Sequence, residues 1–178
     1  MTRIRLCALC GIAAGAVLVS CSSMREAGTA GGKVTKASAE LSPTQGNNAR
    51  GTVTFTQQSD GIRVVAHLTG LPAGTHGFHI HEKGDCSAPD GSSAGGHFNP
   101  MSMPHGGPEA AQHHEGDLGN IVADSTGTAT YDRVLAFLGL NGPTSIVGRS
   151  VVVHLDADDL TSQPAGNSGP RIACGVIK

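Results

Sequence analysis

Several features common in other protein classes are missing from this sequence. Its 178 residues include no tryptophan and one tyrosine, and no segment shows a convincing helical periodicity. The net charge of −2, with histidine neutral, lacks the basic excess that nucleic-acid binding requires, so no nucleic-acid partner is expected. After residue 30 no apolar run reaches the ~20 residues that a membrane-spanning helix needs. These absences argue against a nucleic-acid binder, a helical protein and a membrane-spanning domain.

Glycine and proline are abundant instead, with 26 and 9 copies, and they divide the chain into short segments. The segment 50–58 alternates cleanly, with Val53 and Phe55 on one face and threonines on the other. We expect eight strands, at 36–42, 50–58, 61–70, 77–82, 116–124, 127–137, 148–156 and 171–178. The sequence therefore predicts an all-β domain, an eight-stranded antiparallel Greek-key sandwich or barrel.

Two of the expected connections are too long to be hairpins, at roughly 83–115 and 157–170. Long loops without secondary structure in a compact domain are usually functional or disordered. The first connection contains four histidines, at positions 97, 105, 113 and 114. Histidines commonly bind metals or take part in catalysis, so disorder is the poorer interpretation of the first connection. We expect both connections to be functional loops.

The N-terminus has the pattern of an export signal. Arg3 and Arg5 precede an apolar run at 6–19, which ends in Leu-Val-Ser-Cys at 18–21. These four residues resemble the lipobox of bacterial lipoproteins. We expect a signal peptide at 1–20, a lipidated Cys21 with a flexible tether to residue 36, and a domain at 37–178. The protein would then lie in a bacterial cell envelope, on the periplasmic side, held to a membrane by its lipid. An ordinary secretory signal with an incidental cysteine is the alternative.

The five cysteines divide according to this expected processing. Cys7 and Cys10 leave with the signal, and Cys21 carries the lipid. Cys86 and Cys174 remain as an even pair in an exported protein, which predicts one disulfide. It would close a loop of about 90 residues and contribute up to about 4–5 kcal/mol by the chain-entropy argument.

A pair of histidines indicates a metal site. His79 and His81 lie two positions apart in an expected strand, so they share a face, and Ile80 between them faces apolar packing. Surface strands carry such pairs by chance, but seven of the nine histidines fall between positions 76 and 114. Zinc accepts three histidines and one carboxylate, and copper also suits imidazole. The clustering predicts a metal centre.

Five blocks of the sequence resemble, in order and spacing, the signatures of the copper/zinc superoxide dismutases. They are GFHIHEKGDC at 77–86, GGHFNP at 95–100, HGGP with HHEGDLGN within 105–120, VVVHLDADDL at 151–160 and GNSGPRIACGVI at 166–177. The resemblance covers about residues 37–178. It implies copper held by His79, His81, His97 and His154, and zinc held by His97, His105, His114 and Asp117.

The resemblance also implies roles for residues around the metals. His97 would bridge copper and zinc and take part in proton transfer. Asp158 would accept hydrogen bonds from ligands of both metals, although a solvated loop charge is the alternative. Arg171 would line the copper channel and bind superoxide, with a plain salt bridge as the alternative. The disulfide between Cys86 and Cys174 would pin the first loop and hold Arg171 near copper.

Four other residues are expected to stay outside the metal centre. His76 matches the resemblance as a hydrogen-bonding structural residue, and His113 is expected to face solvent beside the matched His114. His67 is expected to be an ordinary exposed strand residue. Asp159 is expected to be a solvated loop charge next to Asp158.

The implied activity is the disproportionation of superoxide to dioxygen and hydrogen peroxide by copper cycling between two oxidation states, which would protect the cell envelope. Cys86 directly follows Asp85, a spacing similar to that of the bacterial branch. The second loop is short and has no lysine, so neither charged guidance nor the contacts of a homodimer can be transferred from eukaryotic members. A copper- and zinc-buffering lipoprotein without activity is the first alternative. An adhesion domain with incidental histidines is the second.

Overall fold

A computed structural model describes residues 32–178; the expected signal peptide, Cys21 and most of the tether lie outside the described residues. Residues Lys33–Lys178 form one compact unit. Its strands are β1 (Lys36–Pro43), β2 (Arg50–Gln57), β3 (Ile62–Thr69), β4 (Gly74–His81), β5 (Asp117–Ala123), β6 (Ala129–Leu135), β7 (Ser150–His154) and β8 (Arg171–Val176). In this part of the chain the helical structure is η1 (Ser92–Ala94), one short turn, and no helix there could cross a membrane.

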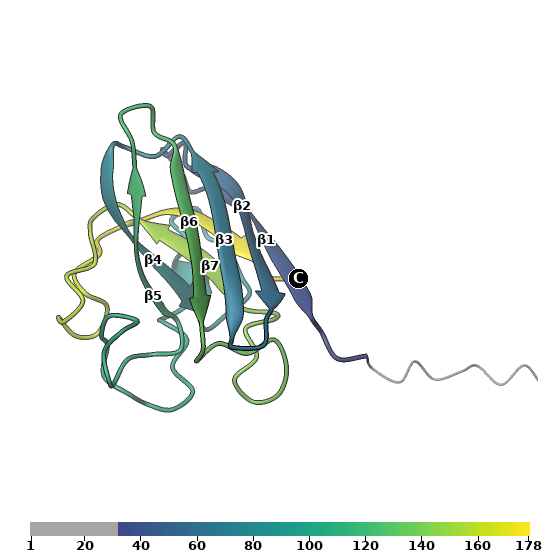
Figure 1. The fold of residues 1–178 in the computed structure, drawn as a ribbon. Coiled ribbons are helices and arrows are strands. Elements are labelled where there is room, and N and C mark those ends of the chain that lie inside the picture. Colours follow the sequence, from purple (N-terminus) through teal and green to yellow (C-terminus); the bar gives the residue numbers. More distant parts are fainter. Residues whose placement is uncertain (1–31) are drawn as a thin grey trace, which may run out of the picture. The chain divides into compact units, whose positions relative to one another are not determined.

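The strands form a closed barrel in the order β1-β2-β3-β6-β5-β4-β7-β8, and all pairs are antiparallel (Figure 1). The pairing of Ser42 in β1 with Cys174 in β8 closes it. Strand β3 lies beside β6, and β4 lies beside β7, so some neighbours in the barrel are not consecutive in the sequence. The chain must therefore cross over between them, as in Greek-key folds. The predicted eight-stranded all-β class is confirmed.

Alternation along the strands builds the core. In β3 every second residue is buried, and β1 follows the same rule over most of its length. Phe78 of β4 and Tyr131 of β6 meet edge to face, with ring centroids 5.2 Å apart. The Tyr131 hydroxyl donates a hydrogen bond of 3.0 Å to the Leu118 carbonyl, which satisfies its polar end inside the barrel. Period-two patterning was therefore a sound guide to the strands that face solvent on one side.

Strand β4 departs from this alternation because its last six residues are all buried. Phe78 and Ile80 belong to the core, whereas His79 and His81 lie on the other face, which the two long loops cover. In His76, Nδ1 lies 3.0 Å and 2.8 Å from the carbonyl oxygens of His154 and Leu155, and Nε2 lies 2.8 Å from that of Pro72. The structural role expected for His76 is observed.

The structure contains a third long connection that the sequence analysis did not predict. Strand β6 ends at Leu135, and residues 136–149 form a loop before β7 (Figure 1). Leu138, Leu140 and Ile146 of this loop are buried in the core. The expected strand to residue 137 was too long, because the apolar residues that follow β6 pack against the barrel from a loop instead of continuing the ladder.

Candidate metal centre

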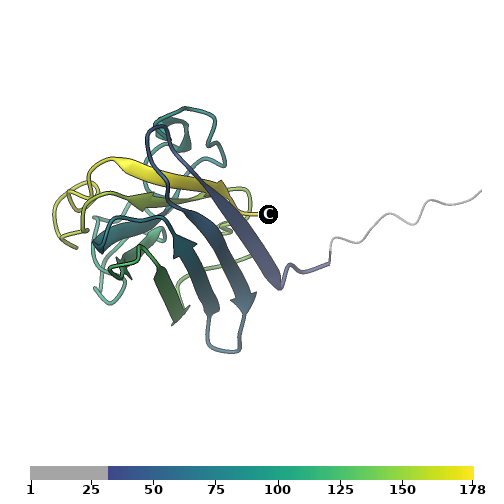
Figure 2. The same ribbon diagram turned by 90° about the horizontal axis from the view of Figure 1, so that it is seen from above.

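Two connections form the site: the first loop (82–116, between β4 and β5) and the second loop (155–170, between β7 and β8). The second loop and the teal-green part of the first loop lie on the same side of the barrel in both ribbon views (Figure 1, Figure 2). An isolated bridge between His81 and His97 joins the first loop to the end of β4. The histidines of β4 and β7 are thereby enclosed between barrel and loops.

One group of potential ligands consists of four buried histidines, which we call the four-histidine group: His79, His81, His97 and His154. One ring nitrogen from each lies within 4.8 Å of the others. Nδ1 of His79 and Nε2 of His97 are buried without a hydrogen-bond partner. Nε2 of His81 and Nε2 of His154 lie 3.2 Å apart. Buried polar atoms are rarely left unpaired, so these nitrogens suit a metal that takes imidazole, such as copper.

A second group, the aspartate group, surrounds one carboxylate oxygen. Nδ1 of His97, of His105 and of His114 lie 2.8, 3.0 and 3.3 Å from Oδ1 of Asp117. A tetrahedral zinc ion with bonds of about 2.0–2.1 Å spaces its ligands about 3.3 Å apart. The three nitrogens and one oxygen therefore have the identity of a zinc site, and the nitrogens lie from the oxygen at or somewhat below that spacing.

His97 belongs to both groups. Its Nδ1 faces Asp117, and its Nε2 has no hydrogen-bond partner among residues 32–178. One imidazole ring can therefore offer a nitrogen to each of two metals.

Asp158 connects the two groups from the second loop. Its Oδ2 lies 2.7 Å from Nε2 of His79, and its Oδ1 lies 3.0 Å from Nε2 of His105, with the carboxylate buried. These contacts favour a proton on Nε2 of each ring, so Nδ1 is the nitrogen that each histidine can offer to a metal. Nδ1 of His79 has no hydrogen-bond partner among the described residues, whereas Nδ1 of His105 faces Asp117. The solvated loop charge considered as an alternative for Asp158 does not describe this residue.

The protonation of the two groups differs. Burial and neighbouring histidines lower the pKa of His97 to about 4 and of His154 to about 3, and burial also lowers that of His81 well below its usual value. Burial lowers the pKa of His105 too, but hydrogen bonds to Asp117 and Asp158 outweigh it and raise the pKa to about 9. At neutral pH His81, His97 and His154 are therefore uncharged, whereas His105 of the aspartate group carries a proton beside the Asp117 carboxylate.

Arg171 begins β8, opposite His154 in the sheet register. Its guanidinium donates hydrogen bonds to the carbonyl oxygens of Gly91 and Gly95 in the first loop. A small cavity of about 160 Å³ lies beside His154, lined by second-loop residues and by no lysine or arginine. A polar depression of about 350 Å³ is lined by Arg171, and Gly169 lines both spaces. Arg171 is thus a cation next to the entrance at His154.

The expected disulfide is present between Cys86 of the first loop and Cys174 of β8. Ser150 and Arg149 also hold the start of this loop, by donating to the carbonyl oxygens of Lys83 and Glu82. The first loop is thereby tied to the same two strands, β7 and β8, that carry His154 and Arg171.

Comparisons with known proteins agree with this geometry. The family model described as "Copper/zinc superoxide dismutase (SODC)" matches residues 49–177. The chain belongs to the copper/zinc superoxide dismutase family. It is 47% identical over 136 residues to "Superoxide dismutase [Cu-Zn] 2" of Brassica juncea, which covers 72% of this chain and 88% of the relative. The solved structure described as the clock protein EA4 superposes with a TM-score of 0.74 at 46% identity, covering 80% of this chain and 93% of the other.

As a copper/zinc superoxide dismutase the chain is an oxidoreductase with copper and zinc as cofactors, and both groups contain suitable ligands. Three further polar residues discussed from the sequence lie outside both groups. His113 is half-buried and packs on Phe137, with ring centroids 4.3 Å apart, so it is less exposed than expected. His67 is exposed on β3, as expected. Asp159 is exposed but accepts hydrogen bonds from Thr161 and Ser162, so it organises the second loop and is more than a solvated charge.

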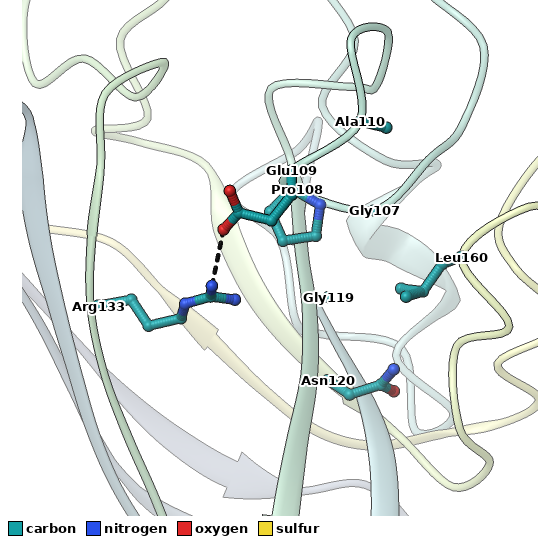
Figure 3. A pocket seen from close by; sticks show the side chains of 8 residues that line it. All are labelled: Gly107, Pro108, Glu109, Ala110, Gly119, Asn120, Arg133 and Leu160. Atoms are coloured by element: carbon teal, nitrogen blue, oxygen red, sulfur yellow. Dashed lines mark hydrogen bonds and ion pairs between the residues drawn. The ribbon is translucent and has the colours of Figure 1, made fainter.

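A groove of the dismutase domain lies away from both groups. It has a volume of about 540 Å³ and lies between the first loop, β5, β6 and Leu160 (Figure 3). Glu109 and Arg133 form an ion pair of 2.7 Å there, and neither histidine group lines it. This groove is larger than the spaces beside His154 and Arg171, but it contains none of the candidate metal ligands.

Two carboxamide residues of the centre were not singled out from the sequence. Asn120 of β5 and Gln163 of the second loop each make a pair of hydrogen bonds with the main chain next to the metal groups. Their partners are 38 and 58 positions away in the sequence. The position of Asn120 within the block HHEGDLGN was the only available signal, and Gln163 had none.

Proposed function

We propose that this chain catalyses the disproportionation of superoxide, in which two superoxide anions and two protons give dioxygen and hydrogen peroxide. The observation that carries the proposal is the shared residue His97, since one ring joins a four-histidine group to an aspartate group. A plain metal store needs ligands but no such pairing of a redox metal with a redox-inert one. When bound, copper supplies the one-electron chemistry and zinc supplies a fixed charge.

We assign copper to the four-histidine group (His79, His81, His97 and His154) and zinc to the aspartate group (His97, His105, His114 and Asp117). Softness and geometry support this choice, because imidazole suits copper and a tetrahedral site with a carboxylate suits zinc. The substitution Asp117→Ala is expected to cause loss of zinc before loss of copper, and to leave part of the copper-dependent activity. Loss of copper alone, measured by metal analysis, would contradict the assignment.

Arg171 and His97 are assigned the steps that the chain itself performs. The guanidinium of Arg171 attracts the anion and orients it by a charge-assisted hydrogen bond. Nε2 of His97 is a buried nitrogen without a hydrogen-bond partner in the described part of the chain, so it can hold a proton for the forming peroxide when it is not bound to a metal. Asp158 keeps His79 and His105 in the tautomer that leaves Nδ1 free.

The deciding experiment is superoxide decay with trace amounts of the chain from Ser22 to Lys178, loaded with copper and zinc. We expect fast catalytic decay that disappears when copper is removed. Tight stoichiometric binding of both metals without faster decay would contradict the enzyme and support a metal-buffering protein.

The cellular setting is a separate part of the proposal. We infer that the enzyme belongs to the bacterial periplasmic lipoprotein type, with a lipid on Cys21, and that it protects the cell envelope from external superoxide. The pattern at 1–21 and the disulfide support this setting, because structural disulfides persist in oxidising compartments. Labelling with a fatty-acid analogue that is lost in Cys21→Ser tests it; label retained in that variant, or absent from the parent chain, contradicts it. Analytical ultracentrifugation separates a monomer from a homodimer.

A further inference from the structure

The side chain of Gln163 is paired with the main chain of His105. The His105 N–H donates a hydrogen bond of 2.8 Å to Oε1 of Gln163. Nε2 of Gln163 in turn donates a hydrogen bond of 2.9 Å to the His105 carbonyl oxygen. The oxygen and the nitrogen of one carboxamide thus bind the backbone N–H and the backbone carbonyl of one residue, 58 positions away in the sequence.

This pairing acts on a ring that has almost no freedom. Nε2 of His105 is held by Asp158, and Nδ1 faces Asp117. Gly166 of the second loop lies so close that a Cβ built there would come within 1.8 Å of Oδ1 of Asp158 and 2.7 Å of Nε2 of His105. The second loop therefore holds His105 at its ring and, through Gln163, at its backbone.

A second carboxamide serves as an internal comparison. Nδ2 of Asn120 donates 2.9 Å to the Asp158 carbonyl oxygen, and the Asp158 N–H donates 2.8 Å to Oδ1 of Asn120. Figure 3 shows the Asn120 side chain at the groove, opposite Leu160 of the second loop. Asn120 thus secures the acid that contacts both histidine groups, whereas Gln163 secures a residue of the aspartate group alone.

We propose that Gln163 is a positioning residue that sets the affinity of the aspartate group for zinc without changing the four-histidine group. The inference rests on the assignment of zinc to His105 made above. Its physical basis is preorganisation: a ligand whose backbone is already held needs less ordering when the metal binds. Partners outside the ligand sphere commonly change metal affinity by about 10–100-fold.

The test compares zinc and copper affinities of the full-length protein by competition with a chromophoric chelator. Gln163→Met keeps the length of the side chain and removes both hydrogen bonds to His105, together with a third to the Thr161 carbonyl oxygen. We expect zinc affinity to fall about tenfold with copper affinity unchanged. Gln163→Ala also removes the carboxamide and adds no charge near the zinc ligands, so the loss of zinc affinity should be similar. Thr161→Ala is the matched control, because its exposed side chain lies in the same loop and does not contact His105.

Three outcomes would overturn the inference. Unchanged zinc affinity in Gln163→Met would show that the pairing does not matter, and equal losses of zinc and copper would show a general loosening of the loop. A loss of zinc affinity in Thr161→Ala as large as that in Gln163→Met would also show a general loosening of the loop. If Gln163→Met fails to fold, Gln163→Ala decides by the same ratio of affinities. Failure of the parent protein to bind zinc at all would instead contradict the proposed function.

Discussion

The two loops that enclose the metal centre contribute to it in opposite ways. The first loop carries three of the proposed ligands, His97, His105 and His114, and the second loop carries none. The second loop nevertheless touches both groups, through Asp158 and through the Gly169 carbonyl, which lies 3.0 Å from Nδ1 of His154. One loop therefore supplies metal-binding atoms, and the other determines how those atoms are presented. The type of ligand is therefore determined mainly in the first loop, and the orientation of the ligands is determined mainly by the second loop.

The largest effect is expected from removing a ligand that neither loop provides. His154→Ala at the end of β7 should reduce superoxide turnover to the rate in buffer, because copper loses one of four imidazoles, while zinc stays bound. Metal analysis and superoxide decay measure the two effects. His113→Ala, next to the aspartate group but outside it, is the control. Full turnover with stoichiometric copper in His154→Ala would remove this residue from the ligand set.

The next effect concerns the covalent attachment of the first loop. Replacing Cys86 and Cys174 together by serine should lower the free energy of unfolding of the metal-free protein by up to about 4–5 kcal/mol, since the bond closes a long loop in the unfolded chain. Urea unfolding of the oxidised parent, the reduced parent and the double variant measures it. Equal stability of all three would mean that the barrel, with Ser150 and Arg149, already holds the loop.

A smaller effect, shared by both metals, is expected from the second loop. Asp158→Asn keeps the size of the side chain but removes the charge that both histidines contact, so affinities for copper and zinc should each fall about 10–100-fold. Asp159→Asn, its exposed neighbour, is the control. If only one metal were affected, the second loop would not act as a common support for the two groups.

The pH dependence of metal binding should separate the groups further. The pKa of His105 is raised to about 9, so this ring is protonated at neutral pH and zinc must displace the proton. Zinc affinity should therefore rise about tenfold per pH unit from about pH 7 toward pH 9. His97 and His154, with pKa values of about 4 and 3, are already neutral there, so copper affinity should stay nearly constant. Parallel titrations of the metal-free protein check this, and equal slopes for the two metals would contradict it.

The sequence by itself determined the fold class and the chemical types of the ligands. Alternation and turn residues are local, so the solvent-facing strands could be found without long-range information. The alternation was less reliable where apolar residues are buried from a loop. The apolar residues after β6 were expected to extend the strand, but they lie in the loop 136–149 and pack against the barrel from there. The clustered histidines predicted a metal centre, because the metals accept few kinds of side chain. The members of each group were implied by the resemblance of five sequence blocks to the copper/zinc superoxide dismutases.

Only the tertiary structure decided which atom of each residue faces the centre and what holds it there. Nδ1 of His79 is free because Asp158 takes Nε2 from 79 positions away, and His105 is held by Gln163 from 58 positions away. A carboxamide or a carboxylate in a polar loop has no local signature, since its role depends on the main chain that folding brings beside it. Residue identity could therefore be predicted from the sequence, but the free nitrogen, the bound proton and the two carboxamide pairings arise from contacts between distant segments.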